Sequence, residues 1–234
     1  MTSDAADLSF DNRIARQLRG FGPLGVLAIL IILLGNVLFI PLSAILVLIW
    51  ARLSRTPWRE IGYVRPKSWT RTLAVGIVFG VAFKFAMKAI VMPLLGAPPI
   101  NEAYHFLAGN TAAIPWALYT IILGAGFGEE TIFRGWMFER FGKLFGSSVA
   151  AKASPVRLGL IVLITSTWFA AEHYAVQGLP GVEQAMITGL TFGTIFAITG
   201  SIFLPMVAHA AFEVAALAMI YWDVEPSVAH LIFK

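Results

Sequence analysis

The chain has 234 residues, of which 58% are hydrophobic and only 13% are charged, and its mean hydropathy is +0.79. Soluble domains carry roughly 25% charged residues, so this composition predicts a polytopic membrane protein. The absence of cysteine excludes disulfides, thiolate metal ligands and a cysteine nucleophile. The net charge of +4 is modest, and the basic residues flank apolar segments, so nothing indicates binding to nucleic acid.

We expect an all-α fold, a polytopic transmembrane helical bundle of about six to eight spans, because one span needs roughly 20 residues. Residues 1–22 mix acidic and basic side chains and contain no short apolar core followed by small residues. We interpret them as a cytoplasm-compatible tail and not as a signal peptide. Residues 23–234 then form a single membrane-embedded domain whose core covers about 72–222.

The first apolar stretch, from about Pro23 to Ala51, is longer than one span requires and is interrupted at Gly35, Asn36 and Pro41. It is either one long kinked helix or a tight pair of short helices. Arginines precede and follow it. A hairpin would place both basic flanks on the same side of the membrane, whereas a single span would place one of them outside.

The rest of the chain predicts further spans separated by short loops. Their expected ranges are about 72–95, about 114–145, 158–174, 182–198 and 202–222. The basic segments 52–71 and 140–157 are expected on the cytoplasmic side, and the loop 96–113, which contains no Lys or Arg, on the outer side.

Three of these spans carry ionisable residues within apolar sequence. Such residues are costly in hydrocarbon and are functional candidates by default. They are Glu129, Glu130 and Arg134 in one segment, His173 in a second, and His209 with Glu213 in a third. The segments are far apart along the chain, so they predict one polar site assembled from several helices.

The spacing of the first group places its two acids, Glu129 and Glu130, differently relative to Arg134. Glu130 and Arg134 are four residues apart, so on a helix they share a face and can pair. Glu129 is five residues from Arg134, roughly 140° around the helix axis, so it is the less compensated carboxylate and the candidate general base. The plainer alternative is a structural ion pair with an acid at a helix end.

The histidine segments have a spacing of their own. His209 and Glu213 share a face, which suits two metal ligands or a carboxylate that orients an imidazole. The plainer alternative is a hydrogen-bonded pair that locks helix packing. Elsewhere, Lys84 and Lys88 share a face of an apolar helix and either extend toward the membrane surface or bind an anionic headgroup.

Taken together, the three polar segments resemble the signatures of the CAAX protease and bacteriocin-processing family, the CPBP or Abi-type intramembrane peptidases. The family's motifs are E-E-x-x-x-R, F-x-x-x-H and H-x-x-x followed by Asn or Asp. They are matched, in this order, by Glu129, Glu130 and Arg134, by Phe169 and His173, and by His209 with Glu213 in the final place.

The resemblance implies an intramembrane endopeptidase that hydrolyses a peptide bond of a membrane-associated substrate, of the CAAX type or bearing a leader. Glu129 would activate a water molecule with assistance from His173, while His209 and the residue at 213 would stabilise the oxyanion. The catalytic core would then be the region of about 72–222. Glu130, Arg134 and Phe169 would support these residues.

The acid at 213 departs from the family's pattern. An ionised carboxylate cannot donate to an oxyanion, so Glu213 is protonated, orients His209, or completes a metal site. No cofactor is favoured. A divalent metal such as zinc remains an open alternative, with Glu129, His173, His209 and Glu213 as candidate ligands.

The expected partners are a membrane protein or peptide substrate and the lipid bilayer, with no nucleic acid and with the oligomeric state left open. We expect a multi-pass protein of the bacterial plasma membrane. Two other functions would use the same buried residues: a non-catalytic immunity or scaffold protein, and an ion-coupled transporter.

Overall fold

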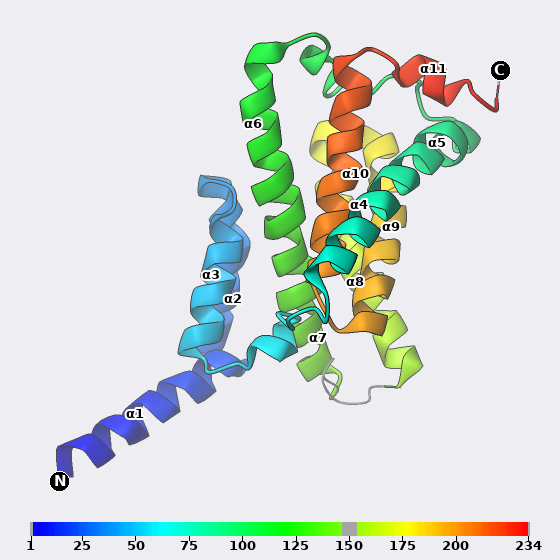
Figure 1. Ribbon diagram of the computed structural model, residues 1–234. Helices are drawn as coiled ribbons and strands as arrows, with labels where there is room; N and C mark the ends of the chain where they lie inside the picture. Colours follow the sequence, from blue (N-terminus) through cyan, green and yellow to red (C-terminus); the bar gives the residue numbers. More distant parts are fainter. Residues whose placement is uncertain (1, 147–153, 234) are drawn as a thin grey trace.

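The computed structural model describes residues 2–146 and 154–233, with side chains described from residue 11 onward, so part of the basic loop 140–157 lies outside the described residues. Every regular element in these ranges is a helix (Figure 1). Within them, five helices are long and apolar enough to cross a membrane, or six if the bent pair α1–α2 counts as one span. The all-α polytopic bundle is therefore confirmed.

The first apolar stretch forms a hairpin of two short helices, α2 (Pro23–Leu38) and α3 (Leu42–Leu53). Its turn is closed by reciprocal hydrogen bonds. The Asn36 backbone N–H donates to Ser43 Oγ at 2.9 Å, and the Ser43 N–H donates to Asn36 Oδ1 at 3.1 Å. Asn36 thus stabilises the turn of the hairpin. Of the two alternatives for this stretch, the pair of short helices is therefore the one that forms.

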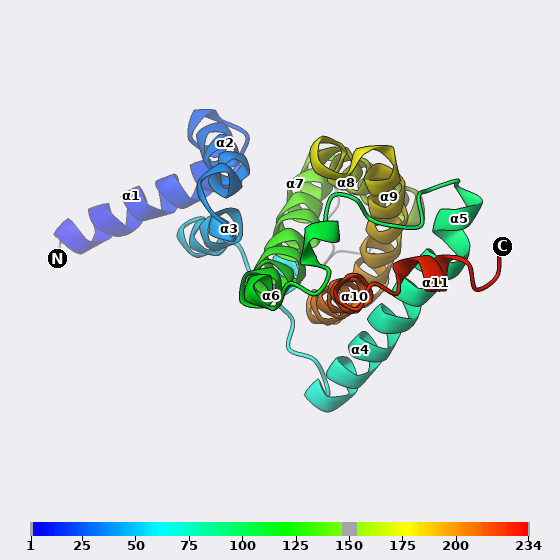
Figure 2. The ribbon, with the colours of Figure 1, turned by 90° about the horizontal axis from the view of Figure 1, so that it is seen from above.

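The hairpin brings both basic flanks to one end of the molecule. Helix α1 (Thr2–Arg19) precedes α2 at an angle of 61°. The Trp50 indole N–H donates to the carbonyl of Leu18 at 3.0 Å, and the Arg55 guanidinium donates to Asn12. The end of α1 therefore contacts the end of α3. Figures 1 and 2 show this unit at one side of the bundle, with α1 pointing away from it.

The next long span, Trp69–Leu94, runs through α4 (Trp69–Ala86), a wider π-helical turn η2 (Met87–Val91) and α5 (Met92–Leu94). It crosses α10 (Phe203–Tyr221) at close range (Figure 2). Small residues permit this approach: a Cβ on Gly80 would collide with the carbonyl oxygen of Ala208 and lie 2.9 Å from Ala211 Cβ. Small residues at such crossings are typical of membrane helices.

One continuous helix carries the E-E-x-x-x-R motif. It consists of α6 (Ile114–Tyr119), η5 (Thr120–Glu129), η6 (Thr131–Trp136) and α7 (Met137–Leu144). The extent agrees with the predicted 114–145, but η5 and η6 have π-helical turns, which occur frequently at functional sites. A Cβ on Gly126 would lie 3.0 Å from Ala210 Cβ, so the glycines of η5 let α10 pack close to the motif.

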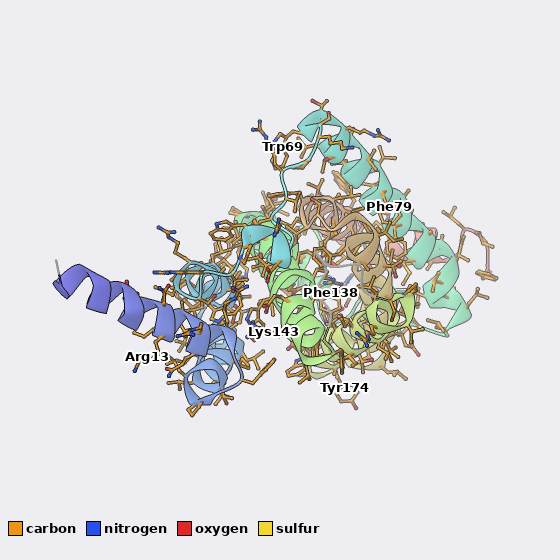
Figure 3. The ribbon with its side chains drawn as sticks, turned by 90° about the horizontal axis from the view of Figure 1, so that it is seen from below. Arg13, Trp69, Phe79, Phe138, Lys143 and Tyr174 are labelled. Atoms are coloured by element: carbon orange, nitrogen blue, oxygen red, sulfur yellow. The ribbon has the colours of Figure 1, made fainter. Side chains whose placement is uncertain are left out.

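Helices α8 (Pro155–Glu172) and α9 (Tyr174–Thr199) form an antiparallel pair on the side of the motif helix that faces away from the α2–α3 hairpin (Figure 2). Gly178 adopts φ 61° near the start of α9 and breaks the helix there, between the expected spans 158–174 and 182–198. Between these helices, Phe138 lies toward the centre of the bundle when it is seen from below (Figure 3). Its ring packs edge-on against Phe196 with centroids 4.9 Å apart.

Short elements complete the two ends. They are η1 (Trp58–Ile61), η3 (His105–Leu107), η4 (Thr111–Ala113) and α11 (Glu225–Ala229). Figure 1 shows α11 beside α5 at the end of the bundle opposite α1. There a buried ion pair joins Lys88 Nζ to Glu225 Oε1 at 2.6 Å, and Glu225 Oε2 accepts from the backbone N–H of Asn101 at 3.2 Å.

The close crossing of α4 and α10 leads to a prediction about how a methyl group added at Gly80 affects stability. We expect Gly80→Ala to lower the free energy of unfolding by about 1–3 kcal/mol, because the added carbon overpacks against the α10 backbone. Gly159→Ala in α8 is the matched control, since a Cβ there meets nothing within 4 Å. Thermal unfolding in detergent measures both; equal melting temperatures for the two variants would contradict the close crossing.

Candidate active site

A buried ion pair lies at the centre of the polar site. Arg134 Nη1 and Glu130 Oε1 are 2.9 Å apart, with side chains 2% and 0% exposed. The spacing of four residues predicted this pair. The guanidinium also lies 4.7 Å from the centroid of the Phe169 ring of α8, and its Nη2 donates to the carbonyl of Gly189 on α9 at 3.5 Å. One arginine therefore connects η6 with both helices of the neighbouring pair.

The same carboxylate holds the buried imidazole of α10. His209 Nδ1 is hydrogen-bonded to Glu130 Oε1 at 2.7 Å, and its Nε2 lies 3.8 Å from Glu129 Oε2. Because the carboxylate accepts, Nδ1 carries the proton of this bond. Glu130 thus orients the ring and directs the second nitrogen toward Glu129. The sequence left open whether Glu213 orients His209; in the structure, the carboxylate bonded to the ring is Glu130 of the motif helix.

His209 and Glu129 lie on different helices, α10 and the motif helix. The two side chains meet, and Figure 1 shows why: α7 continues below the point where α10 begins. The sixth residue after the start of α10 therefore reaches the middle of the long motif helix.

Glu129 differs from its neighbour in exposure. Its side chain is 31% exposed, whereas that of Glu130 is fully buried. Glu129 lines a cavity of about 320 Å³ between the motif helix, α8, α9 and α10, here called the central cavity. The other ionisable side chains that line it are His173, His209, Glu213, Lys84 and Tyr104. The structure therefore brings the residues of all three motifs to one cavity.

His173 follows the last turn of α8. Its Nδ1 is 2.8 Å from the carbonyl oxygen of Phe169, so Nδ1 donates and Nε2 is left as the acceptor. The Phe169 ring packs against this imidazole with centroids 4.7 Å apart and against His209 at 6.0 Å. The F-x-x-x-H spacing thus places the Phe169 carbonyl where it accepts from His173 Nδ1, and the Phe169 ring packs against both imidazoles.

Glu213 lines the central cavity but forms neither a hydrogen bond nor an ion pair within 4.0 Å in the described part of the chain. Across the described ranges, no group of three or more His, Asp or Glu side chains is arranged so that it could hold a metal ion. The alternative of a zinc site made from Glu129, His173, His209 and Glu213 stays a prediction, which chelation tests.

Two side chains of the cavity were not assigned to the site from the sequence. Tyr104 lies in the loop before η3, and burial, followed by the negative charges of Glu213 and Glu129, raises the pKa of its phenol above the ordinary value of 10.0. Lys84 was expected at the membrane surface, but it is 5% exposed and faces inward. Neither lies in a motif, and only the folding of the chain brings them to the cavity.

The ion pair generates a prediction about stability. We expect Arg134→Met to lower the free energy of unfolding by roughly 3–5 kcal/mol, because it leaves the Glu130 carboxylate buried without its cation. The double variant Glu130→Gln with Arg134→Met should recover part of this loss, since no unpaired charge remains. Thermal and denaturant unfolding in detergent measure the difference, and equal losses in the single and double variants would argue against a buried charge pair.

Comparison with known proteins agrees with the motifs. Residues 111–215 match the family model whose description is type II CAAX prenyl endopeptidase, Rce1-like. The matched segment runs from the beginning of the motif helix into α10 and contains all the motif residues. No curated protein and no solved structure matches the chain. Over this segment the chain is similar to the type II CAAX prenyl endopeptidases, which are peptide-bond hydrolases, and this agrees with the resemblance of the three motifs to the CAAX protease and bacteriocin-processing family.

Proposed function

We propose that the protein is an intramembrane endopeptidase in which Glu129 activates a water molecule for attack on a peptide bond of a membrane-associated substrate, of the CAAX type or bearing a leader. One observation carries this proposal: a partly exposed carboxylate and two imidazoles line one cavity inside a bundle of apolar helices. Hydrolysis of a peptide bond needs a general base to activate water and donors to stabilise the oxyanion, and these side chains can supply both.

In the first step, the water lies between Glu129 and His173. The Glu129 carboxylate takes a proton from the water, and His173 accepts a second hydrogen bond at Nε2, because its Nδ1–H is already committed to the Phe169 carbonyl. The water oxygen attacks the carbonyl carbon, and the carbonyl π electrons move onto its oxygen. This produces a tetrahedral intermediate with one negative charge.

His209 and Tyr104 stabilise that charge. The His209 ring carries protons on both nitrogens in this scheme: Nδ1–H donates to Glu130, and Nε2–H donates to the oxyanion. Carboxylates on both sides of the ring favour this charged form. The phenol of Tyr104 is the second donor. Preorganised donors of this kind typically contribute about 3–4 kcal/mol each to transition-state stabilisation.

The second step returns the proton. The protonated Glu129 donates to the leaving amine nitrogen as the carbon–nitrogen bond breaks, and the oxyanion reforms the carbonyl. The products are a new carboxyl terminus and a free amine. This scheme needs no hydrogen bond from Glu213 and no metal ion; a metal held by the four candidate ligands is the alternative that chelation tests.

We also propose that residues 23–234 form a single domain of the bacterial plasma membrane, with residues 1–22 as a cytoplasmic tail. The support for this proposal is that the basic segments lie at the same end of the molecule. The end of α1 contacts the end of α3, and the Lys143 ammonium of α7 donates to the Arg19 carbonyl at 2.6 Å. Positive charge collected at one end is typical of a cytoplasmic face.

The central test is substitution of the proposed base. Purified wild-type protein incubated with a membrane proteome should generate new peptide termini, and Glu129→Gln should reduce their formation by at least about 1,000-fold while the protein still folds, because the amide cannot take the proton. Mass spectrometry of new termini is the measurement. Cleavage by Glu129→Gln at the wild-type level would remove the proposal.

A nearby acid supplies the matched control. Glu172 lies at the end of α8, accepts a hydrogen bond from the Trp168 indole at 2.9 Å, and does not line the central cavity. Glu172→Gln should therefore cleave like the wild type. Incubating the wild-type protein with a chelator tests metal dependence separately. Unchanged cleavage supports the metal-free scheme. Cleavage that is lost with the chelator and regained with zinc contradicts it.

Tyr104→Phe tests the second oxyanion donor. Loss of one hydroxyl should lower kcat by about 10- to 100-fold with little change in KM, because the phenol acts on charge that develops after binding. Tyr221→Phe is the control, since its hydroxyl meets Thr111 at 3.0 Å outside the cavity. Because burial raises the pKa of Tyr104, its phenol keeps its proton, and can donate, to a higher pH than an ordinary tyrosine does. An unchanged kcat, or a loss confined to KM, would contradict the role.

A further inference from the structure

A cavity lined by arginines lies beside the α2–α3 hairpin, and the catalytic scheme does not use it. It has a volume of about 550 Å³ and lies between the second half of α1 and the turn that follows α3. Figure 3 shows Arg13 on α1, outside the helical bundle. Among the described residues no acidic side chain lines this space, which we call the arginine cavity. The polar residues that line it are Asn12, Arg13, Arg16, Arg19, Ser54 and Arg55.

Most of the positive charge around the arginine cavity is not neutralised within the protein. Arg19 forms an ion pair with Glu60 at 3.2 Å, but its buried Nε has no hydrogen-bond partner among the described residues. Arg13, Arg16 and Arg55 form no ion pair within 4.0 Å in the part of the chain whose side chains are described. Guanidinium groups gathered around one hollow repel one another. An anion that several of them share would therefore be favourable there.

The backbone at Arg55 is held in an unfavourable conformation. Its φ of 54° lies in the left-handed region, which glycine adopts freely and arginine rarely. In this conformation the Arg55 guanidinium donates to Asn12 Oδ1 of α1. Charge that only orients the helices in the membrane requires no such backbone, since it can lie at any position on the same side. An arginine at a position that suits glycine indicates a specific use of its side chain.

The arginine cavity lies at the depth where lipid headgroups begin. Arg19 is the last residue of α1 and lies four residues before the start of α2, and Arg55 lies two residues after the end of α3. A headgroup in the cavity would allow its acyl chains to lie along the apolar surface of α2, which a soluble anion cannot do. The exposed apolar side chains of α2 include Leu27, Leu30, Ile31 and Leu34.

We infer that the arginine cavity binds the phosphate headgroup of an anionic phospholipid. Planar guanidinium groups form paired hydrogen bonds with phosphate oxygens, and arginines from α1 and from the turn after α3 surround one space. The bound headgroup connects these two elements. It also acts on the motif helix through α1, since the Arg19 carbonyl accepts from Arg140 Nη1 at 3.1 Å and from Lys143 Nζ at 2.6 Å. The site lies outside the matched segment 111–215, and the inference does not depend on catalysis.

Lipid binding to the purified full-length protein tests the inference. The protein in a neutral detergent is titrated with phosphatidylglycerol, which is anionic, or with phosphatidylcholine of the same acyl chains, which has no net charge. Native mass spectrometry gives the dissociation constant of the first bound lipid. The parent protein should bind phosphatidylglycerol at least about 10-fold more tightly, because basic pockets beside membrane helices favour anionic headgroups.

Variants assign this preference to the arginine cavity. The triple variant Arg13→Gln, Arg16→Gln and Arg55→Gln should bind the two lipids equally. The matched control removes three exposed charges from the basic segment that leads into α4 and should keep the preference; its changes are Arg65→Gln, Lys67→Gln and Arg71→Gln.

A second variant applies if the triple variant does not fold. Arg55→Gly removes one guanidinium and keeps the turn, because glycine adopts the left-handed backbone without strain. It should bind phosphatidylglycerol about 3- to 10-fold more weakly than the parent and phosphatidylcholine equally well.

A soluble headgroup distinguishes a lipid from a free phosphate compound. Glycerophosphoglycerol carries the phosphate of phosphatidylglycerol without its acyl chains, so it should compete at least about 100-fold more weakly than the lipid. Four outcomes would overturn the inference. They are equal binding of the two lipids by the parent, including no binding of either; a preference that survives in the variants of the arginine cavity; a preference lost equally in the control; and competition by glycerophosphoglycerol at the concentration of the lipid itself.

Discussion

The polar site depends on the buried carboxylate of Glu130. It accepts from Arg134 on one side and from His209 on the other, and Arg134 in turn contacts the α8–α9 pair. Charges in a low-dielectric interior are tolerated only when each has its partner, so this chain of contacts fixes the relative positions of the motif helix, α9 and α10. In a bilayer, where hydrophobic burial between helices contributes little, such polar contacts and close packing of small residues are what select one arrangement.

Two adjacent acids have different environments because the helix turns one inward and the other toward the cavity. Glu130 is fully buried, and Glu129 is about one-third exposed, at 31%. A carboxylate that is bonded on both sides cannot also serve as a base, whereas one that faces an open cavity can. The π-helical turns of η5 and η6 carry this pair, and the glycines of η5 admit α10 close enough for His209 to reach both acids. Local backbone geometry and side-chain chemistry thus act together.

The molecule is also polarised along its length. Basic residues of α1, α3 and α7 gather at one end, whereas the central cavity lies toward the other end, below the loop of Tyr104 and the C-terminal helix α11. The Lys88–Glu225 ion pair holds that loop and helix against the bundle. The central cavity is therefore lined by the Lys84 ammonium, by acid and imidazole groups, and by apolar side chains.

Much of this could be predicted from residue types and spacing. The hydropathy identified the membrane bundle, and the four-residue separation of Glu130 and Arg134 predicted their pairing, because helical periodicity is a local property. Asn36 and the arginines around the first stretch were compatible with a hairpin but could not decide it, since the closing bonds join residues on two helices. The spacing on one helix offered Glu213 as one possible partner of His209, whereas the carboxylate bonded to the ring is Glu130 of the motif helix. Which carboxylate reaches an imidazole, and whether Lys84 faces lipid or a cavity, depends on how separate helices cross, and those crossings are determined by close contacts such as that between Gly80 and Ala208, which only the tertiary structure contains.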